Sequence, residues 1–177
     1  MQGQGDEGIA QLREGLSAYQ STGAEWARTY FLALLADALG QVGRPEEGLS
    51  VLAEALEFVE QRGKRAYEAE IYRLYGELTL QKQSVARGPV TEVEDRPASA
   101  SRSPESDTGK CFQRAIEIAQ KQQAKSFELR AVMNLSRLWQ KQGKEARQLL
   151  ADIYGWFTEG FDTKDLQEAK ALLEELH

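Results

Sequence analysis

Apolar residues recur at helical spacing along most of the chain. In residues 24–42, Leu32, Leu35 and Leu39 lie at positions i, i+3 and i+7, which places them on one face of a helix. The same spacing occurs in residues 67–82 and 126–142. The corresponding residues are Tyr72, Tyr75 and Thr79 in the second segment, and Val132, Leu135 and Trp139 in the third. The pattern predicts three amphipathic helices of one kind.

A second kind of helix alternates with the first. The pattern of residues 43–58 predicts a short turn followed by an amphipathic helix. Residues 5–19 have the same pattern, and equivalent positions in the two segments lie 40 residues apart. A third copy lies at 111–118, and a shorter fourth copy lies at 146–150. The matched positions are Gly8 with Gly48, Leu12 with Leu52 and Phe112, and Gly15 with Ala55 and Ala115. The sequence therefore predicts an internal repeat of helix pairs.

Turn residues and small residues support this pairing. Gly43 and Gly143 follow predicted helices and suit the left-handed conformation that ends many helices. Pro45 lies in the first turn of the next helix, where a missing N–H costs nothing. One pair cannot bury its apolar face alone, whereas stacked pairs bury a continuous core. A small residue follows the middle apolar residue of each first-kind helix and would let the paired helix approach closely: Ala36, Gly76 and Ser136.

Residues 84–109 interrupt the repeat. The segment holds three of the four prolines and five serines, and its sizeable apolar residues are Val85, Val90 and Val93. This composition cannot offset the entropy cost of ordering, so we predict a disordered insert between the two helices of one pair. A linker between two domains is the alternative, but the repeat frame resumes after the segment.

These positions resemble the tetratricopeptide repeat (TPR), although no copy matches the signature completely and the period of about 40 residues exceeds the usual 34. The resemblance implies an all-α fold, a TPR-like α-solenoid of antiparallel helix pairs with a C-terminal capping helix. Residues 1–177 would form one domain, with a partial repeat at about 1–22, repeats at 24–62, 64–122 and 124–156, and a cap at 157–177. The residues that carry the resemblance are Leu32, Leu35, Ala36, Leu39, Gly48, Leu52 and Ala55, then Tyr72, Tyr75, Gly76, Thr79, Thr108, Phe112 and Ala115, then Val132, Leu135, Ser136, Trp139, Ala146 and Leu150.

A more specific resemblance lies at the C-terminal end. Residues 154–176, YGWFTEGFDTKDLQEAKALLEEL, resemble the C-terminal tail of bacterial multidomain proteins that join a class III adenylate or guanylate cyclase domain, a signalling-type ATPase and a TPR array. Residues 11–80 resemble the preceding repeats of those proteins. The resemblance implies a regulatory origin. Because the first predicted helix is of the second kind and lacks a partner, we expect the chain to be a fragment or truncated product.

Composition and charge narrow the possible functions. The 177 residues include 22 Lys and Arg and 28 Asp and Glu, which gives a formal net charge of −6. This balance argues against nucleic acid as a partner, because phosphate binding needs a clustered excess of basic residues. Most of the acidity lies at residues 145–177, which contain 8 acidic and 3 basic residues. We expect this acidic end to aid solubility.

The residue types needed for common catalytic and metal sites are scarce. One cysteine, Cys111, and one histidine, His177, exclude an internal disulfide and a Cys/His zinc site. Each Gly-Lys pair lacks the following Ser or Thr of a P-loop. We therefore expect no enzyme activity, no cofactor and no metal, although composition leaves a catalytic carboxylate pair open. Without a signal sequence or a long apolar stretch, we expect a cytoplasmic protein with no membrane partner.

An aromatic cluster near the C-terminal end has two interpretations. Trp156, Phe157 and Phe161 follow the last second-kind helix and lie among glycines. They would either pin the final helix, residues 165–176, onto the array or form an exposed hot spot for a partner. We favour the first interpretation.

The first-kind helices would line the concave face of a TPR-like array, where a partner would bind. Helical position then selects Tyr30, Ala33, Asp37 and Gln41 in the first helix, Glu70, Arg73, Glu77 and Gln81 in the second, and Arg130, Met133, Arg137 and Lys141 in the third. The charge along this face would run from acidic to basic, which suits an extended peptide with a matching gradient. A plain solvated face is the alternative.

The leading hypothesis is a non-catalytic scaffold that binds a protein or peptide in signalling. The alternative is an autoregulatory segment that controls a cyclase or ATPase domain of its parent protein or complex. The sequence leaves the oligomeric state open.

Overall fold

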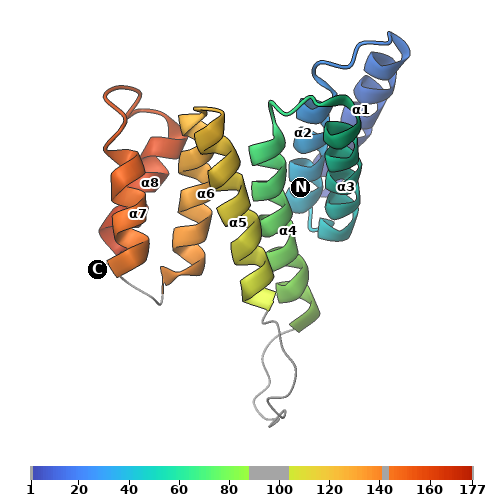
Figure 1. Ribbon diagram of the computed structural model, residues 1–177. Coiled ribbons are helices and arrows are strands. Elements are labelled where there is room, and N and C mark those ends of the chain that lie inside the picture. The colour runs from blue at the N-terminus through green and yellow to red at the C-terminus, as the bar shows by residue number, and fades with distance from the viewer. Residues whose placement is uncertain (1, 88–103, 141–143, 177) are drawn as a thin grey trace.

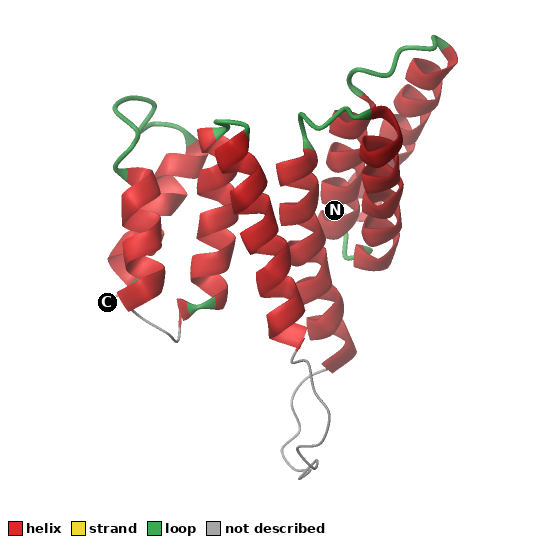
Figure 2. Ribbon diagram, viewed as in Figure 1, coloured by secondary structure: helices red, strands yellow, loops and turns green. Residues whose placement is uncertain are grey.

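The computed structural model describes residues 2–87, 104–140 and 144–176, and every regular element within them is a helix (Figure 2). Three consecutive antiparallel helix pairs stand in one row, with a single helix before them and another after them (Figure 1). In chain order the helices are α1 (Gln2–Ser21), α2 (Arg28–Gln41), α3 (Pro45–Arg62), α4 (Glu68–Arg87), α5 (Pro104–Lys121), α6 (Lys125–Leu138), α7 (Lys144–Tyr154) and α8 (Lys164–Glu175).

The helices form two layers. Helices α2, α4, α6 and α8 pack against one another in sequence and make the inner layer, while α3, α5 and α7 each pack between two inner helices. Helix α8 contacts both α6 and α7, so it occupies the position that the first helix of a fourth pair would take. The element order and the packing of neighbours are those of a solenoid, in which each unit contacts only its neighbours.

Gly43 and Pro45 occupy the turn positions that the sequence predicts for them. Gly43 has a φ of 78° between α2 and α3, and Pro45 occupies the first turn of α3. Gly63 ends α3 with a φ of 66°, and its N–H donates to the carbonyl of Val59 at 2.8 Å. Glycine adopts these left-handed angles without steric cost. Gly143 lies outside the described residues.

Several predicted helix bounds are wrong, and the helix predicted at residues 126–142 ends at Leu138. The first inner helix begins at Arg28 and not at residue 24, because Gly23 has a φ of 74° and the hydroxyl of Tyr19 accepts a hydrogen bond from the N–H of Ala27. The predicted insert, residues 84–109, is helical at both ends, since α4 continues to Arg87 and α5 begins at Pro104. Proline suits that first position of a helix. The remainder of the insert, residues 88–103, lies outside the described part of the chain.

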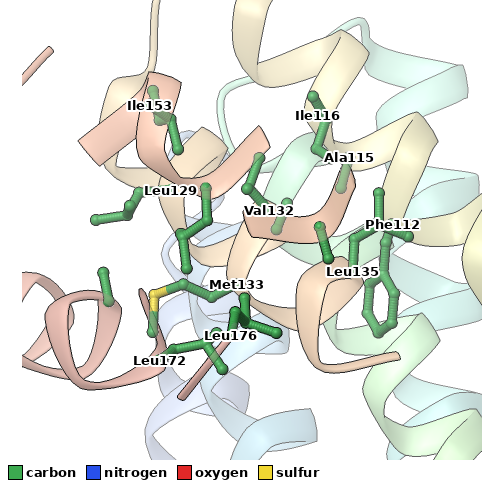
Figure 3. Packing of buried hydrophobic residues seen from close by; sticks show 14 of the residues in the cluster. Phe112, Ala115, Ile116, Leu129, Val132, Met133, Leu135, Ile153, Leu172 and Leu176 are labelled. Atoms are coloured by element: carbon green, nitrogen blue, oxygen red, sulfur yellow. The ribbon is translucent and has the colours of Figure 1, made fainter. Parts of the chain in front are cut away.

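The core follows the inner layer from pair to pair. Phe112, Leu129, Val132, Leu135 and Leu150 are almost fully buried in one cluster, to which α8 adds Leu166 and Leu172 (Figure 3). A second cluster joins α2, α3 and α4. In α4 the fully buried stripe is Ile71, Leu74 and Leu78, whereas the predicted stripe of Tyr72, Tyr75 and Thr79 is only half-buried. Helix α4 packs on α2 and α3 on one side and on α5 and α6 on the other, so it buries two faces.

The small residues allow close packing, as predicted. Ala36 and Ser136 are fully buried. At Gly76, an added Cβ would lie 2.6 Å from Cε1 of the buried Phe112 ring.

None of the helices in the described part of the chain combines the length and the apolar character that a membrane span requires.

The same substitution at two glycines is expected to change stability in opposite directions. Gly76→Ala should lower the free energy of unfolding by about 1–3 kcal/mol, because the new methyl group collides with Phe112. Gly15→Ala should raise it by about 0.5–1 kcal/mol, because that helical glycine has open space around its Cα. Urea unfolding followed by circular dichroism measures both. Equal effects at the two sites would contradict the packing at Gly76.

Candidate peptide-binding groove

The inner layer encloses a groove of about 470 Å³ between α2, α4, α6 and α8. Each helix presents to it one face with helical periodicity. The lining residues are Tyr30, Ala33, Leu34, Asp37 and Gln41 of α2; Glu70, Arg73, Leu74 and Glu77 of α4, with Tyr67 just before that helix; Arg130, Met133, Asn134 and Arg137 of α6; and Lys164, Asp165 and Glu168 of α8.

The structure brings together most of the residues that helical position selected. Tyr30, Ala33, Asp37, Gln41, Glu70, Arg73, Glu77, Arg130, Met133 and Arg137 all line the groove. Gln81 lies outside that lining, and its amide is positioned against Gly40. Lys141 lies outside the described residues.

An ion-pair network occupies the centre of the groove. Nε and Nη2 of Arg73 each donate to a carboxylate oxygen of Glu70 at 2.9 Å, and Nη1 donates to Glu77. The side chains of Arg73 and Glu70 are only 12% and 11% exposed. Bidentate pairing of this kind keeps a buried guanidinium charged, and the neighbouring carboxylates raise the pKa of Arg73 despite its burial.

Helix α8 contributes a wall that sequence reasoning missed. Nε of Arg130 donates to Asp165 at 2.6 Å, and Nη2 of Arg137 donates to Glu168 at 3.3 Å. Arg130 also reaches Glu70 of α4 at 3.4 Å. Asp165 raises the pKa of Arg130, although desolvation by burial opposes this effect. The acidic excess of residues 145–177 was a signal of such pairing, but it was assigned to solubility.

These contacts flatten the charge gradient that the sequence predicted. On the α2–α4 side, the groove carries Asp37, Glu70 and Glu77 against Arg73, a net charge of −2. On the α6–α8 side, it carries Arg130, Arg137 and Lys164 against Asp165 and Glu168, a net charge of +1. The direction from acidic to basic is the expected one, but the acids of α8 neutralise most of the basic end.

Asp37 is the least compensated acid in the groove. Gln41 donates a hydrogen bond to it at 2.8 Å, but among the described residues no Lys or Arg forms an ion pair with it. Desolvation by burial raises the pKa of Asp37. The negative charges of Glu77 and Glu70 raise this pKa further, and the positive charge of Arg73 lowers it. The folded protein therefore holds this carboxylate at a cost in stability.

Neutralising Asp37 is expected to stabilise the fold. Its pKa is higher in the folded than in the unfolded state, so the folded chain binds the proton more tightly and stability falls as pH rises through the folded-state pKa. Asp37→Asn should accordingly raise the melting temperature at pH 7. The gain should disappear at acid pH, where the wild-type carboxyl is protonated. A lower melting temperature for Asp37→Asn at pH 7 would contradict this assignment.

Aromatic side chains form one rim of the groove. The rings of Tyr30 and Tyr67 lie 5.1 Å apart, and those of Tyr67 and Phe127 lie 5.8 Å apart. Tyr30 and Leu34 are both more than a third exposed. The rim thus offers apolar surface directly beside the charged centre, which is the composition expected of a recognition site.

The C-terminal aromatic residues divide between the two interpretations. Phe157 packs against the core cluster that includes Leu166 and Leu172, as expected for a residue that pins α8. Trp156 is 58% exposed, and its ring centroid lies 5.8 Å from the Lys125 ammonium group. Phe161 is 46% exposed and contacts the Tyr154 ring at a tilted angle. The pinning interpretation therefore applies to Phe157 and not to the other two.

The described residues include neither an activated thiol nor a cluster that could hold a metal ion. Burial raises the pKa of the Cys111 thiol, and Asp107 adds to the shift, so the reactive thiolate is disfavoured. Among the described residues, no group of three or more His, Cys, Asp or Glu is placed to hold a metal ion.

Comparisons with known proteins establish the fold. No family model matches the chain, and no curated protein matches its sequence. Among solved structures, the chain is similar to one from Podosopora anserina that is described as nearly identical TPR-like repeats of a kinesin light chain. The TM-score is 0.57 and the sequence identity is 17%. The match covers 98% of this chain and 86% of the other. The chain is therefore an all-α, TPR-like α-solenoid, as its sequence predicted.

Proposed function

We propose that the chain is a non-catalytic scaffold that binds an extended segment of another protein in the groove between α2, α4, α6 and α8. The observation that carries the proposal is the convergence of four helices on one hollow face that combines an aromatic rim with a charged centre. TPR-like repeats generally mediate protein interactions, which supports the same function.

The geometry suits an extended peptide. The network of Glu70, Arg73 and Glu77 is held by contacts within α4, so its side chains are ordered before a partner arrives. Preorganised side chains reduce the entropy lost on binding. Exposed apolar groups at Tyr30 and Leu34 would gain from burial, and the polar centre would fix the register of the peptide.

Removing the apolar rim should abolish most binding. The probe is a library of 12-residue peptides, acetylated and amidated at their termini and random in sequence, passed over the immobilised chain. We expect Tyr30→Ala with Leu34→Ala to weaken binding of the retained peptides by at least about tenfold, because exposed aromatic anchors dominate such interfaces. Trp26→Ala with Val85→Ala, which removes exposed apolar groups outside this groove, is the matched control. Failure of the folded wild-type chain to retain any peptide would overturn the proposal.

A regulatory setting is the narrower form of this proposal. The sequence resemblance of residues 154–176 to bacterial cyclase–ATPase proteins supports a cyclase or ATPase domain as partner or neighbour in a cytoplasmic signalling protein. Co-expression of the chain with a class III cyclase domain from the same genome tests it. Altered cyclase activity that disappears with the Tyr30 and Leu34 double variant would support autoregulation. Unchanged cyclase activity at a saturating concentration of the chain would exclude the cyclase domain as the partner and leave the scaffold function in place.

A further inference from the structure

The uneven charge of the groove identifies what kind of peptide fits it. The side formed by α2 and α4 keeps a net charge of −2 after its internal ion pair, whereas the opposite side keeps only +1. The larger uncompensated charge therefore lies at Asp37 and Glu77, beside the exposed side chains of Tyr30 and Leu34. This inference rests on the proposed peptide-binding function and extends it to the chemistry of the partner.

Arg73 forms no ion pair with Asp37, and it divides its single charge between Glu70 and Glu77. All three of its side-chain nitrogens donate to Glu70 and Glu77 on its own helix. Arg73 and Asn134 both donate to Oε2 of Glu77, so Oε1 remains able to accept another hydrogen bond. Asp37 accepts from Gln41 through Oδ2 only, so its Oδ1 has the same capacity. Among the described residues, the groove thus presents one further acceptor oxygen on each of two adjacent helices, where three acids share the single charge of Arg73.

We propose that the groove selects a basic peptide, in which a Lys or Arg side chain places its cationic head between Asp37 and Glu77. The aliphatic stem of that side chain would lie against Leu34 and Tyr30, since long cationic side chains bury their methylene groups while the head stays among polar groups. An Arg would gain most from two acceptors on neighbouring helices, because its guanidinium donates in a fixed fork. An acidic segment would meet uncompensated carboxylates at this point and is disfavoured.

The alternative occupants differ in what they would place at this position. An acidic peptide would have to bind through Arg130, Arg137 and Lys164, but all three already pair with acids of α8. A purely apolar segment would leave Asp37 desolvated without a partner, which costs free energy. A cation supplies the missing charge and offsets the cost of the desolvation that raises the pKa of Asp37.

The test compares the composition of retained peptides and then the affinity of one matched pair. Peptides retained from the random 12-residue library by the full chain are sequenced. The best binder is resynthesised with its Lys or Arg replaced by norleucine, which keeps the stem and removes the charge. Both peptides are titrated by fluorescence anisotropy against the wild type, Asp37→Asn and Glu14→Gln. Glu14 is an exposed acid of α1 outside the groove, so Glu14→Gln controls for the loss of one carboxylate.

We expect the retained pool to be enriched in Lys and Arg. Asp37→Asn should weaken the basic peptide about tenfold and leave the norleucine peptide within about twofold, because a hydrogen bond to a charged group typically contributes a factor of this size. Glu14→Gln should change neither affinity by more than about twofold. Retained peptides that show no basic enrichment, or equal losses for both peptides on Asp37→Asn, would overturn this inference while leaving peptide binding intact. A chain that retains no peptide would instead overturn the proposed function itself.

Discussion

Phe112→Ala is expected to lower the free energy of unfolding by about 3–5 kcal/mol, the range found when a buried Phe is truncated in a core. The ring is fully buried and packs against the backbone of Gly76, where an added Cβ would lie 2.6 Å away. Gly76 itself has no side chain that could move in to fill the cavity. The loss is a large fraction of the about 5–15 kcal/mol that stabilises most domains.

The measurement is urea unfolding followed by far-ultraviolet circular dichroism, with Phe161→Ala as the matched control. Phe161 is 46% exposed and makes one ring contact, with Tyr154. Its truncation should cost about 1 kcal/mol or less. If Phe161→Ala destabilises the chain as much as Phe112→Ala does, the core is not organised around the contact between α4 and α5.

Arg73→Met is expected to cost about 3 kcal/mol, because it leaves the buried Glu70 without its bidentate partner. Both side chains are nearly nine-tenths buried, so water replaces the lost hydrogen bonds only in part. Arg130, at 3.4 Å from Glu70, compensates only in part because Asp165 already holds it at 2.6 Å. Glu77 is 39% exposed and can be resolvated when Arg73 is removed.

The double variant Arg73→Met with Glu70→Met separates a broken ion pair from a packing defect. Removing both charges should restore most of the lost stability, since apolar residues of similar volume often replace a buried pair at little cost. Arg137→Met is the exposed control and should cost less than about 1 kcal/mol. If the double variant is no more stable than Arg73→Met, the penalty does not come from an unpaired Glu70.

Helical period was sufficient to place the inner-layer residues. Tyr30, Asp37, Glu77 and Arg137 were assigned to one face from spacing and repeat register, and all four line the same groove. Such positions are predictable because each is fixed by its own helix and by the repeat that stacks that helix on the next.

The role of α8 was not predictable in the same way. The pair Arg130–Asp165 joins residues 35 positions apart, across the turn that contains Gly160 with a φ of 76°. Its formation depends on how that turn returns α8 to the inner layer, and no repeat register describes it. The buried stripe of α4 was also misassigned, because the repeat frame marked Tyr75 and overlooked Ile71 and Leu74 on a helix that buries two faces.

Chemical-shift mapping tests the central claim most directly. A ¹⁵N-labelled sample of the full chain is titrated with the most enriched library peptide, and perturbed amides are assigned. We predict that the largest shifts lie at groove-lining positions of α2, α4, α6 and α8, such as Leu34, Asp37, Glu77 and Arg137. Saturable shifts confined to α3, α5 and α7 would contradict the account, because the partner would then bind the outer layer and not the groove.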